Sequence, residues 1–422
     1  MELKKGYERK INKNFTIYIA KDNKEELNEI LDFNVKIHGP PVKEYLSRIL
    51  LKHPRIEELL FLYIRDNFSN DIVSGIALFP LDWHFDDLLI PVCEMGFVGT
   101  LPEYRGKKLM AHLFETYEKA MRERGIILSV IRGIPYFYRK YNYEFALPLD
   151  NRIYLSPTQV PTEDVSDLTI RRANEGDIEL ISRLYHDYYD DFFIRNKLST
   201  EEFKFRYFNE DYNDFKLVTY MIEKNGEAET YFSFGMSHDN LAYSLIVPRL
   251  TVKHMIKILQ FIKEIDNSNN SEMLYLHLRE DIDFGKFVMS LGGNPYQDYG
   301  WQVKIPNLKP FFQSIKTILE HRIKKSIYKG LTKSVRISNY QETIELFFKN
   351  GEISEIKTEK GYPAERSCDL QVPGPMIYKL LLADKNFDEI NHIVKDAMVK
   401  LPSKQLVNIL FPKKTSYPDT YY

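Results

Sequence analysis

Apolar residues follow two different periods along the first third of the chain. Short apolar runs bounded by turn residues predict strands, whereas apolar residues three or four positions apart predict helices. The predicted strands cover residues 15–19, 60–64, 71–78, 92–99 and 126–131. The predicted helices cover residues 24–37 and 107–124, and Gly125 ends the second of them. This alternation of strands and helices predicts a mixed α/β fold (α+β in its later part).

The helix predicted over residues 107–124 has one apolar face. Its apolar positions include Leu109, Leu113, Tyr117 and Met121, which recur at helical spacing, while charged residues occupy the other face. We therefore expect this helix to pack against a sheet with the apolar face inward.

A polar segment with two prolines, residues 156–162, predicts a domain boundary. A second unit then opens in the same order as the first. It has a strand over residues 168–170 and a helix that Asn174 caps, and it continues to a Gly-Gly-Asn-Pro break at residues 292–295. The predicted domains are residues 1–155, 163–305 and 306–422.

The last predicted domain has a different pattern, in which a helix precedes a hairpin. An Asn-Gly pair at residues 350–351 lies between two strand-like runs, which is a strong signal for a hairpin turn. The predicted strands are residues 334–337, 343–349 and 353–358, and the predicted helices are residues 310–321, 376–382 and 387–398.

Composition narrows the class of protein. Apolar residues make up 44% of the chain and charged residues 28%, which is typical of a globular protein. With 58 basic and 60 acidic residues the net charge is −2, so we expect neither a nucleic-acid partner nor a membrane partner. No apolar run is long enough to cross a membrane, and the start of the chain lacks a signal sequence. We therefore expect a cytoplasmic protein.

Cysteine and histidine usage argues against a metal site. The two cysteines, Cys93 and Cys368, are too few for a disulfide framework, and the ten histidines are scattered without metal-ligand spacing. Cys93 lies in an apolar strand, so we expect a packed thiol. The 29 tyrosines are more unusual, because each phenol hydroxyl needs a polar neighbour wherever it is buried.

The most informative segment is the basic turn that follows the strand at residues 92–99. Arg105, Lys107 and Lys108 lie at the start of the helix that follows. Free N–H groups and the positive end of the helix dipole favour an anion there, such as a phosphate. The alternative is a simple strand-to-helix turn with solvated basic residues.

The run from Arg105 to Met110 resembles the acetyl-coenzyme A signature of the GNAT superfamily of N-acetyltransferases. In that signature Arg or Gln, two variable residues, Gly, any residue and Gly or Ala cradle the pyrophosphate. Lys108 and Met110 replace the two small residues. A Cβ at position 108 would crowd the pyrophosphate if the backbone approaches it closely. At an ordinary helical φ, by contrast, a lysine at 108 costs little, and it can reach a phosphate.

The resemblance implies three groups of cofactor contacts. The acetyl and pantetheine portion would contact Val98, Gly99 and Thr100. The pyrophosphate would contact Arg105 and the segment Gly106, Lys107, Lys108, Leu109, Met110 and Ala111. Gly133 and Ile134, after the next strand, would line the other side.

A second run, Tyr138 to Tyr143, looks like the family's signature of Tyr, any residue, a basic residue, an aromatic, Gly or Asn, and an aromatic. This resemblance selects the Tyr138 hydroxyl as the group that protonates the departing thiolate, for which a phenol is suitable. Tyr136, Tyr141 and Tyr143 are competing hydroxyls. The alternative is a tyrosine cluster that serves only packing.

The chain as a whole resembles the enhanced-intracellular-survival-like acetyltransferases. That subgroup has a catalytic GNAT domain, a second degenerate GNAT-like domain and a sterol-carrier-protein-like domain. The resemblance implies acetyl-CoA as co-substrate, a small primary amine such as an aminoglycoside or polyamine as acceptor, and a homo-oligomer, in the form of a hexamer. It also implies that the terminal carboxylate, here on Tyr422, acts as base.

Two further expectations remain open at this stage. Acidic residues before and within the strand at 92–99, namely Asp82, Asp86, Asp87 and Glu94, would suit a cationic acceptor, or they serve loop solvation. The alternative to the enzyme is a non-catalytic ligand- or partner-binding protein in which Lys108 marks a degenerate acetyl-CoA site.

Overall fold

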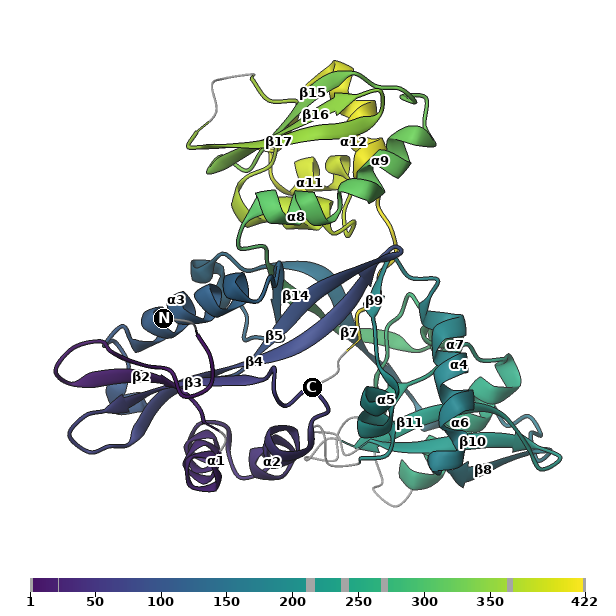
Figure 1. Ribbon diagram of the computed structural model, residues 1–422. Helices are drawn as coiled ribbons and strands as arrows, with labels where there is room; N and C mark the ends of the chain where they lie inside the picture. Colours follow the sequence, from purple (N-terminus) through teal and green to yellow (C-terminus); the bar gives the residue numbers. More distant parts are fainter. Residues whose placement is uncertain are drawn as a thin grey trace.

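The computed structural model describes residues 3–21, 23–209, 217–236, 243–266, 272–362 and 367–419. Tyr422, the predicted base, lies outside these residues. The described chain contains one large sheet that carries helices on its faces, and a smaller C-terminal α+β unit that lies above it in Figure 1. This agrees with the mixed α/β class expected from the hydrophobic pattern.

Fourteen strands of the described chain form one continuous sheet. Their order is β1-β2-β3-β4-β5-β6-β14-β7-β13-β12-β11-β10-β8, and β9 pairs with β4 off this path. The strands are β1 (Glu8–Lys10), β2 (Phe15–Ile19), β3 (Leu60–Asp66), β4 (Ile72–Phe85), β5 (Leu88–Thr100), β6 (Leu128–Ile131), β7 (Glu144–Leu155), β8 (Leu168–Arg172), β9 (Ile194–Asn196), β10 (Val218–Lys224), β11 (Glu227–Met236), β12 (Tyr243–Ile246), β13 (Leu274–His277) and β14 (Asn294–Lys304).

Helices cover both faces of this sheet. In Figure 1, α1 and α2 lie on one side of the strands around β4 and α3 lies on the other. Over the second half lie α4, α5, α6 and α7 (Figure 1). The helices are α1 (Lys24–His38), α2 (Val42–Lys52), α3 (Leu109–Glu123), α4 (Ile178–Tyr189), α5 (Thr200–Tyr207), α6 (Val252–Asp266) and α7 (Asp283–Ser290).

The two halves of the sheet exchange strands in the middle. β14 comes late in the sequence, yet it pairs with β6 on one side and with β7 on the other. β7 in turn pairs with β13. The predicted break at residues 292–295 therefore leads directly into a central strand, and the polar segment at 156–162 connects strands of one sheet.

β5 and β6 separate from each other at one end. Their parallel pairing runs from Val92 and Leu128 to Glu94 and Val130, whereas β5 continues to Thr100. Between Gly96 and Gly99, β5 has a bulge opposite β4, and Phe97 adopts a left-handed φ of 49° there. The result is an opening between the end of β5 and the chain that follows β6.

The amphipathic helix predicted over residues 107–124 is present as α3, and it buries the predicted apolar face. The predicted start of the helix is wrong. Leu109, Leu113, Tyr117 and Met121 are buried as expected. The helix begins at Leu109, however, because Lys108 has φ 61° and ψ 16°, a left-handed conformation that cannot continue a right-handed helix.

The C-terminal unit has a five-stranded sheet within the described residues, with order β17-β16-β15-β18-β19. The predicted hairpin is present, since β16 and β17 pair around residues 350–351. Its elements are α8 (Leu308–Ser314), α9 (Lys316–Lys324), β15 (Lys333–Ser338), β16 (Glu342–Lys349), β17 (Glu352–Lys360), β18 (Leu370–Gln371), α10 (Ile377–Leu381), α11 (Phe387–Ile393), β19 (Met398–Val399) and α12 (Lys404–Leu410).

Two helices predicted in this unit are wrong in extent. The helix expected over residues 310–321 is divided at Ile315 into α8 and α9, both of which bury apolar side chains. The helix expected over 387–398 ends at Ile393, and Met398 then pairs with Gln371 in the sheet. In the second case a tertiary strand pairing overrides the local helical pattern.

Candidate active site

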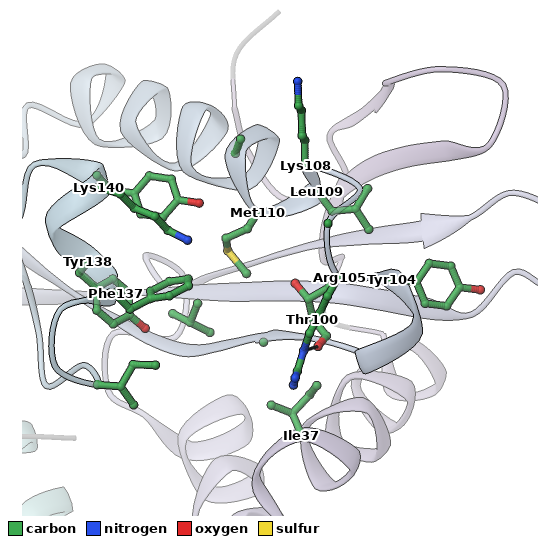
Figure 2. A pocket seen from close by; sticks show the side chains of 16 residues that line it. Ile37, Thr100, Tyr104, Arg105, Lys108, Leu109, Met110, Phe137, Tyr138 and Lys140 are labelled. Carbon is green, nitrogen blue, oxygen red and sulfur yellow. Dashed lines mark hydrogen bonds between the residues drawn. The ribbon is translucent and has the colours of Figure 1, made fainter.

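A cavity of about 670 Å³ lies where β5 and the chain after β6 diverge. Its walls come from α1, the end of β5, the turn before α3, the first turn of α3 and the segment after β6, as Figure 2 shows. The lining residues are Ile37, Val98, Gly99, Thr100, Tyr104, Arg105, Gly106, Lys108, Leu109, Met110, Ala111, Ile134, Phe137, Tyr138, Lys140 and Tyr141.

Most of the residues selected from the sequence meet in this cavity. All of the predicted cofactor-binding residues line the cavity except Lys107 and Gly133. The predicted general acid, Tyr138, lines it as well. Four lining residues were not predicted from the sequence, namely Ile37, Tyr104, Phe137 and Lys140. Three of these residues are close in sequence to predicted residues, so the two motifs could have led to them. Ile37 belongs to a helix distant in sequence, and no nearby residue indicates that it reaches the cavity.

Gly99 permits a close approach of helix α1 to the end of β5. A Cβ built on Gly99 would lie 2.7 Å from Cγ2 of Ile37, so a larger residue would push the helix away. Ser74 holds the same strand end, because its hydroxyl donates to the carbonyl of Gly99 at 3.1 Å and lies 2.7 Å from the hydroxyl of Thr100. The end of β5 is therefore fixed from two sides.

The basic turn has an unusual backbone at two positions. Gly106 has φ 80°, which suits glycine, and Lys108 has φ 61°, which does not suit a lysine. The expectation that Lys108 has an ordinary helical φ is therefore wrong, and the left-handed conformation costs about 1–2 kcal/mol for a residue with a Cβ. The side chain itself is exposed and points away from the cavity in Figure 2.

The other basic side chains of the turn lie differently. Nε of Arg105 donates to the carbonyl of Thr100 at 3.4 Å, which directs the guanidinium along the end of β5. Nζ of Lys107 lies 4.2 Å from the ring centroid of Tyr104, outside the cavity lining. Arg105 is thus the cation of this turn that faces the cavity.

The start of α3 is suited to an anion. Lys108, the cap residue, makes no side-chain hydrogen bond to the helix, and the first turn contains no acidic residue. The positive end of the helix dipole therefore faces the cavity without a competing carboxylate. Met110, which replaces a small residue of the family motif, points its thioether into the cavity in Figure 2 and fills part of it.

Tyr138 lies on a short 3-10 helix, Phe137–Tyr141, and is 5% exposed. Burial raises the pKa of its hydroxyl above the ordinary value, and the phenols of Tyr299 and Tyr141 raise it further. The hydroxyl therefore carries its proton at neutral pH. In Figure 2 it points toward the centre of the cavity.

The competing hydroxyls are less suitable. Tyr136 is 78% exposed. The hydroxyl of Tyr143 is buried beneath the site, 2.7 Å from that of Ser129. Tyr141 lines the cavity, but its ring is stacked on Phe114 at 3.6 Å between centroids.

A buried chain of polar groups supports the site from below. The Sγ of Cys93 lies 3.1 Å from the hydroxyl of Tyr117, which lies 2.9 Å from the hydroxyl of Ser129. Burial raises the pKa of the Cys93 thiol to about 12, so this cysteine is a packed, protonated thiol as expected. The network shows how buried tyrosine hydroxyls are accommodated here.

Gly133, which was selected as a cofactor contact, has a structural role beside Tyr138. A Cβ at this position would overlap the ring of Tyr138, so only glycine allows the tyrosine its place. Its carbonyl accepts hydrogen bonds from Nε2 of Gln302 at 2.7 Å and from the hydroxyl of Tyr299. Strand β14 therefore positions the loop that carries Tyr138.

The acidic residues before the site do not form one cluster. Asp82 pairs with Arg55 at 3.1 Å, and Asp86 lies in the turn between β4 and β5. Glu94 is buried where β5 and β6 separate, and its Oε1 accepts from Nε of Arg132 at 3.1 Å. Burial raises the pKa of Glu94 although Arg132 opposes this.

The described chain offers neither a metal-binding cluster nor a bilayer-spanning helix. Its described residues contain no group of three or more His, Cys, Asp or Glu side chains arranged to hold a metal ion. None of the helices within the described ranges is both long enough and apolar enough to cross a bilayer.

Comparisons with known proteins agree with this geometry. Residues 21–146 match the family model of the acetyltransferase (GNAT) domain. These residues include the end of β5, the basic turn, α3 and Tyr138. The sequence matches none of the curated proteins with which it was compared.

Solved structures share the fold along the whole chain. A conserved protein of unknown function from Enterococcus faecalis, described as a "Probable N-Acyltransferase", has a TM-score of 0.70 at 14% identity, with 99% of this chain and 100% of that chain covered. Eis1 from Mycobacterium abscessus has a TM-score of 0.62 at 10% identity, with 96% and 99% covered.

A third structure holds an acyl-CoA. N-myristoyltransferase from Saccharomyces cerevisiae, solved with bound myristoyl-CoA, has a TM-score of 0.51 at 13% identity, with 70% of this chain and 84% of that chain covered. At these identities the structures establish a common fold. The family-model match assigns a GNAT-type acetyltransferase domain to residues 21–146.

Proposed function

We propose that the protein is an N-acetyltransferase that transfers an acetyl group from acetyl-CoA to a primary amine of a small molecule. The observation that carries the proposal is a single cavity, in the domain that matches the GNAT model, where the end of β5, the uncapped start of α3, Arg105 and Tyr138 meet. These groups are suited to bind acetyl-CoA, which carries both an acyl thioester and a pyrophosphate.

The lining residues fit acetyl-CoA by their chemistry. Arg105 and the backbone N–H groups at the start of α3 suit the pyrophosphate, and the apolar wall with Ile37 and Val98 suits the pantetheine arm. When bound, acetyl-CoA supplies an acetyl group activated as a thioester. A backbone N–H among residues 98–100 would stabilise the oxyanion that forms when an amine attacks the carbonyl.

Tyr138 has the role of general acid in this proposal. Its buried, protonated hydroxyl donates a proton to the departing thiolate, whose conjugate acid has an ordinary pKa near 8.5. Gly133 and strand β14 hold the ring in place for this transfer.

The base in the proposed reaction is the terminal carboxylate of Tyr422, as the family resemblance implies. An ordinary terminal carboxylate has a pKa near 3.5 and is a poor base for an ammonium unless it is desolvated. Orientation of the amine is therefore its larger role in the proposal, and it accepts the proton through water. The chain is described as far as Asp419, three residues before this end.

The finer parts of the proposal rest on the same resemblance. They are an enhanced-intracellular-survival-like enzyme, an aminoglycoside- or polyamine-like acceptor, a sterol-carrier-protein-like C-terminal unit, a homo-oligomer such as a hexamer, and a cytoplasmic location. The shared fold with Eis1 over 96% of the chain supports the domain order.

Calorimetric titration with acetyl-CoA, followed by thiol release in the presence of polyamine and aminoglycoside acceptors, tests the proposal. We expect binding, and release of free thiol that depends on the amine. Absence of binding at millimolar acetyl-CoA would contradict the enzyme. It would favour a non-catalytic binding protein, the alternative that Lys108 in a left-handed conformation and Met110 in the cavity support.

A further inference from the structure

A second cavity, of about 980 Å³, lies where the C-terminal unit meets the large sheet (Figure 1). Its walls come from β7 and β14, from residues 279–281 after β13, and from α10 and residues 413–416 of the C-terminal part of the chain. It shares no lining residue with the candidate active site. Its volume is typical of small-molecule sites, so it can hold an organic ligand of its own.

Positive charge predominates on the walls of this second cavity. Its basic lining residues are Arg279, Lys379, Lys385, Lys413 and Lys414, and its acidic ones are Glu280, Asp281 and Asp384. The excess is local, because the whole chain has a net charge of −2. Such a wall attracts an anion and repels the cationic amine that the proposed acetyl transfer uses as acceptor.

Two of the three acidic side chains already have basic partners in the wall. The carboxylate of Asp281 accepts from Nε and Nη2 of Arg279 at 2.8 and 2.5 Å. The carboxylate of Asp384 lies 3.5 Å from Nζ of Lys385. The Lys414 side chain, by contrast, is exposed and forms no ion pair with any carboxylate of the described residues. Its ammonium group is therefore available to a ligand.

Lys379 places a second, less exposed cation in the wall. Its side chain is 13% exposed, and its Nζ donates to the carbonyl of Phe145. Glu144 lies 3.9 Å from this ammonium, but it also pairs with Arg139 at 3.1 Å, so one buried carboxylate serves two cations. Burial lowers the pKa of Lys379, although Asp384 and Glu144 oppose this. An anion beside Nζ would supply the compensation that this ammonium lacks.

The wall formed by β7 and β14 is apolar. The rings of Phe145 and Tyr299 are in edge contact, with centroids 5.8 Å apart, and Leu147 and Pro148 also line the cavity. Aromatic rings and flat apolar groups pack well against such a surface. The cavity is therefore suited to a ligand that has an apolar body in addition to a negative charge.

The segment that carries Tyr138 separates the two cavities. Pro135 lines the second cavity, whereas its neighbour Ile134 lines the candidate active site. The Tyr299 hydroxyl donates to the carbonyl of Gly133, the residue that makes room for the Tyr138 ring. A ligand in the second cavity would therefore contact residues that hold the Tyr138 segment in place.

We propose that this cavity is a second binding site, which takes a small organic anion with an aromatic or other apolar body. An aryl phosphate and an aryl carboxylate share the required chemistry. Their anionic oxygens suit the ammonium groups of Lys379 and Lys414, and their rings suit the wall with Tyr299. The inference does not depend on acetyl transfer, because none of the residues proposed to bind acetyl-CoA through its pyrophosphate or pantetheine takes part.

Calorimetric titration of the full chain, without acetyl-CoA, tests the site. Phenyl phosphate and benzoate are the probes, inorganic phosphate supplies the charge alone, and benzyl alcohol supplies the ring alone. We expect at least one aryl anion to bind about 10-fold or more tightly than inorganic phosphate or benzyl alcohol, because each of these lacks one of the two contacts. Spermidine, a cation, should not compete with the bound anion.

Variants locate the bound anion. Lys414→Glu should weaken binding of the aryl anion about 10-fold or more, because it reverses a charge on the cavity wall. Lys395→Glu is the matched control, since Lys395 is an exposed lysine of the same C-terminal unit and does not line the cavity. Arg105→Ala, which removes the cation of the candidate active site, should also leave this affinity unchanged. Lys379→Met tests the less exposed cation, and Lys414→Glu carries the comparison if that variant does not fold.

Three results would overturn the proposal. The first is that neither phenyl phosphate nor benzoate binds at millimolar concentration. The second is binding that Arg105→Ala abolishes and Lys414→Glu leaves intact, since the anion would then occupy the candidate active site. The third is displacement of the anion by spermidine. A failure of acetyl-CoA to bind, by contrast, contradicts only the proposed acetyl transfer, because these titrations use no acetyl-CoA.

Discussion

The two halves of the large sheet contain the same strand–helix–strand unit with different turns. In the first half, β5 leads into α3 and pairs in parallel with β6; in the second, β12 leads into α6 and pairs in parallel with β13. The turn before α3 contains two left-handed residues and leaves the helix start uncapped by a side chain. Before α6, the hydroxyl of Thr251 accepts from the backbone of His254 at 3.3 Å.

This difference shows that turn chemistry, more than the sheet, creates the candidate site. A side-chain cap accepts a hydrogen bond from a helix N–H group, so fewer free N–H donors remain at the start of α6 to bind an anion. The start of α3 offers N–H groups and the dipole to a ligand, and Arg105 lies beside it. The same strand–helix–strand unit thus has a candidate binding site at the uncapped start of α3 and a side-chain cap at the start of α6.

The largest expected effect on kcat comes from removing the Tyr138 hydroxyl, the proposed proton donor in the first half of the sheet. Tyr138→Phe should lower kcat by about 100-fold or more, because the departing thiolate loses its proton donor. Thiol release measures this, with acetyl-CoA affinity as a check on the cavity. Tyr136→Phe, at an exposed neighbour, is the control and should retain full turnover. Equal rates for wild type and Tyr138→Phe would contradict the proposed acid.

The contact between the halves should make stability depend on pH. The His53 ring packs against Phe205 at 5.2 Å, and burial lowers the pKa of His53 from 6.5 to about 3, with Arg55 adding to the effect. Below pH 6.5 the unfolded chain binds a proton that the folded chain does not, so stability falls as the pH falls. Between pH 7 and pH 5 the loss is about 2 kcal/mol.

Denaturant unfolding at both pH values measures this loss. His53→Asn keeps an acceptor near the position of Nδ1, which accepts from the backbone N–H of Arg55 at 3.0 Å. The variant should lose less stability than the wild type between pH 7 and pH 5. An equal loss in both proteins would assign the pH dependence to other groups.

Matched arginines in the two turns test the comparison directly. Arg105→Ala should weaken acetyl-CoA binding about 10-fold, as expected for the loss of a charge-assisted contact. Arg249, in the turn before α6, pairs with Asp191 on the surface. Arg249→Ala should leave the affinity unchanged in the same titration. Equal losses in the two variants would remove the distinction between the turns.

The smallest expected effect concerns Lys108. Lys108→Gly relieves the left-handed backbone and should raise stability by about 1 kcal/mol, measured by thermal unfolding. A few-fold gain in acetyl-CoA affinity would accompany it if the lysine hinders a ligand. Lys107→Gly is the control, because Lys107 is not among the described residues with positive φ. A loss of stability in Lys108→Gly would show that the lysine makes a compensating contact.

The local parts of the site could be predicted from the sequence. The segment from Val98 to Ala111 is continuous, and its strand, turn and helix follow from neighbouring residues, so most of the residues that the motif selected there line one cavity. The errors were also local in origin. Lys108 was placed inside the helix, because helical periodicity does not reveal the φ of a cap residue.

The distant parts of the site could not be predicted in this way. Ile37 reaches the cavity from α1, and Gln302 supports Gly133 across 169 positions of sequence. The space that Gly133 leaves for the ring of Tyr138 also became visible only in the structure. Such contacts depend on which strands are neighbours, and hydrophobic pattern does not specify strand neighbours.

The sequence by itself determined the order of elements, the basic turn and the selection of Tyr138, because each depends on residues a few positions apart. Only the tertiary structure decided that β14 enters between β6 and β7 and that the segment ending at Asp419 docks on Arg206. The reason is physical: these arrangements are selected by burial and hydrogen bonding between residues that become neighbours only when the whole sheet has formed.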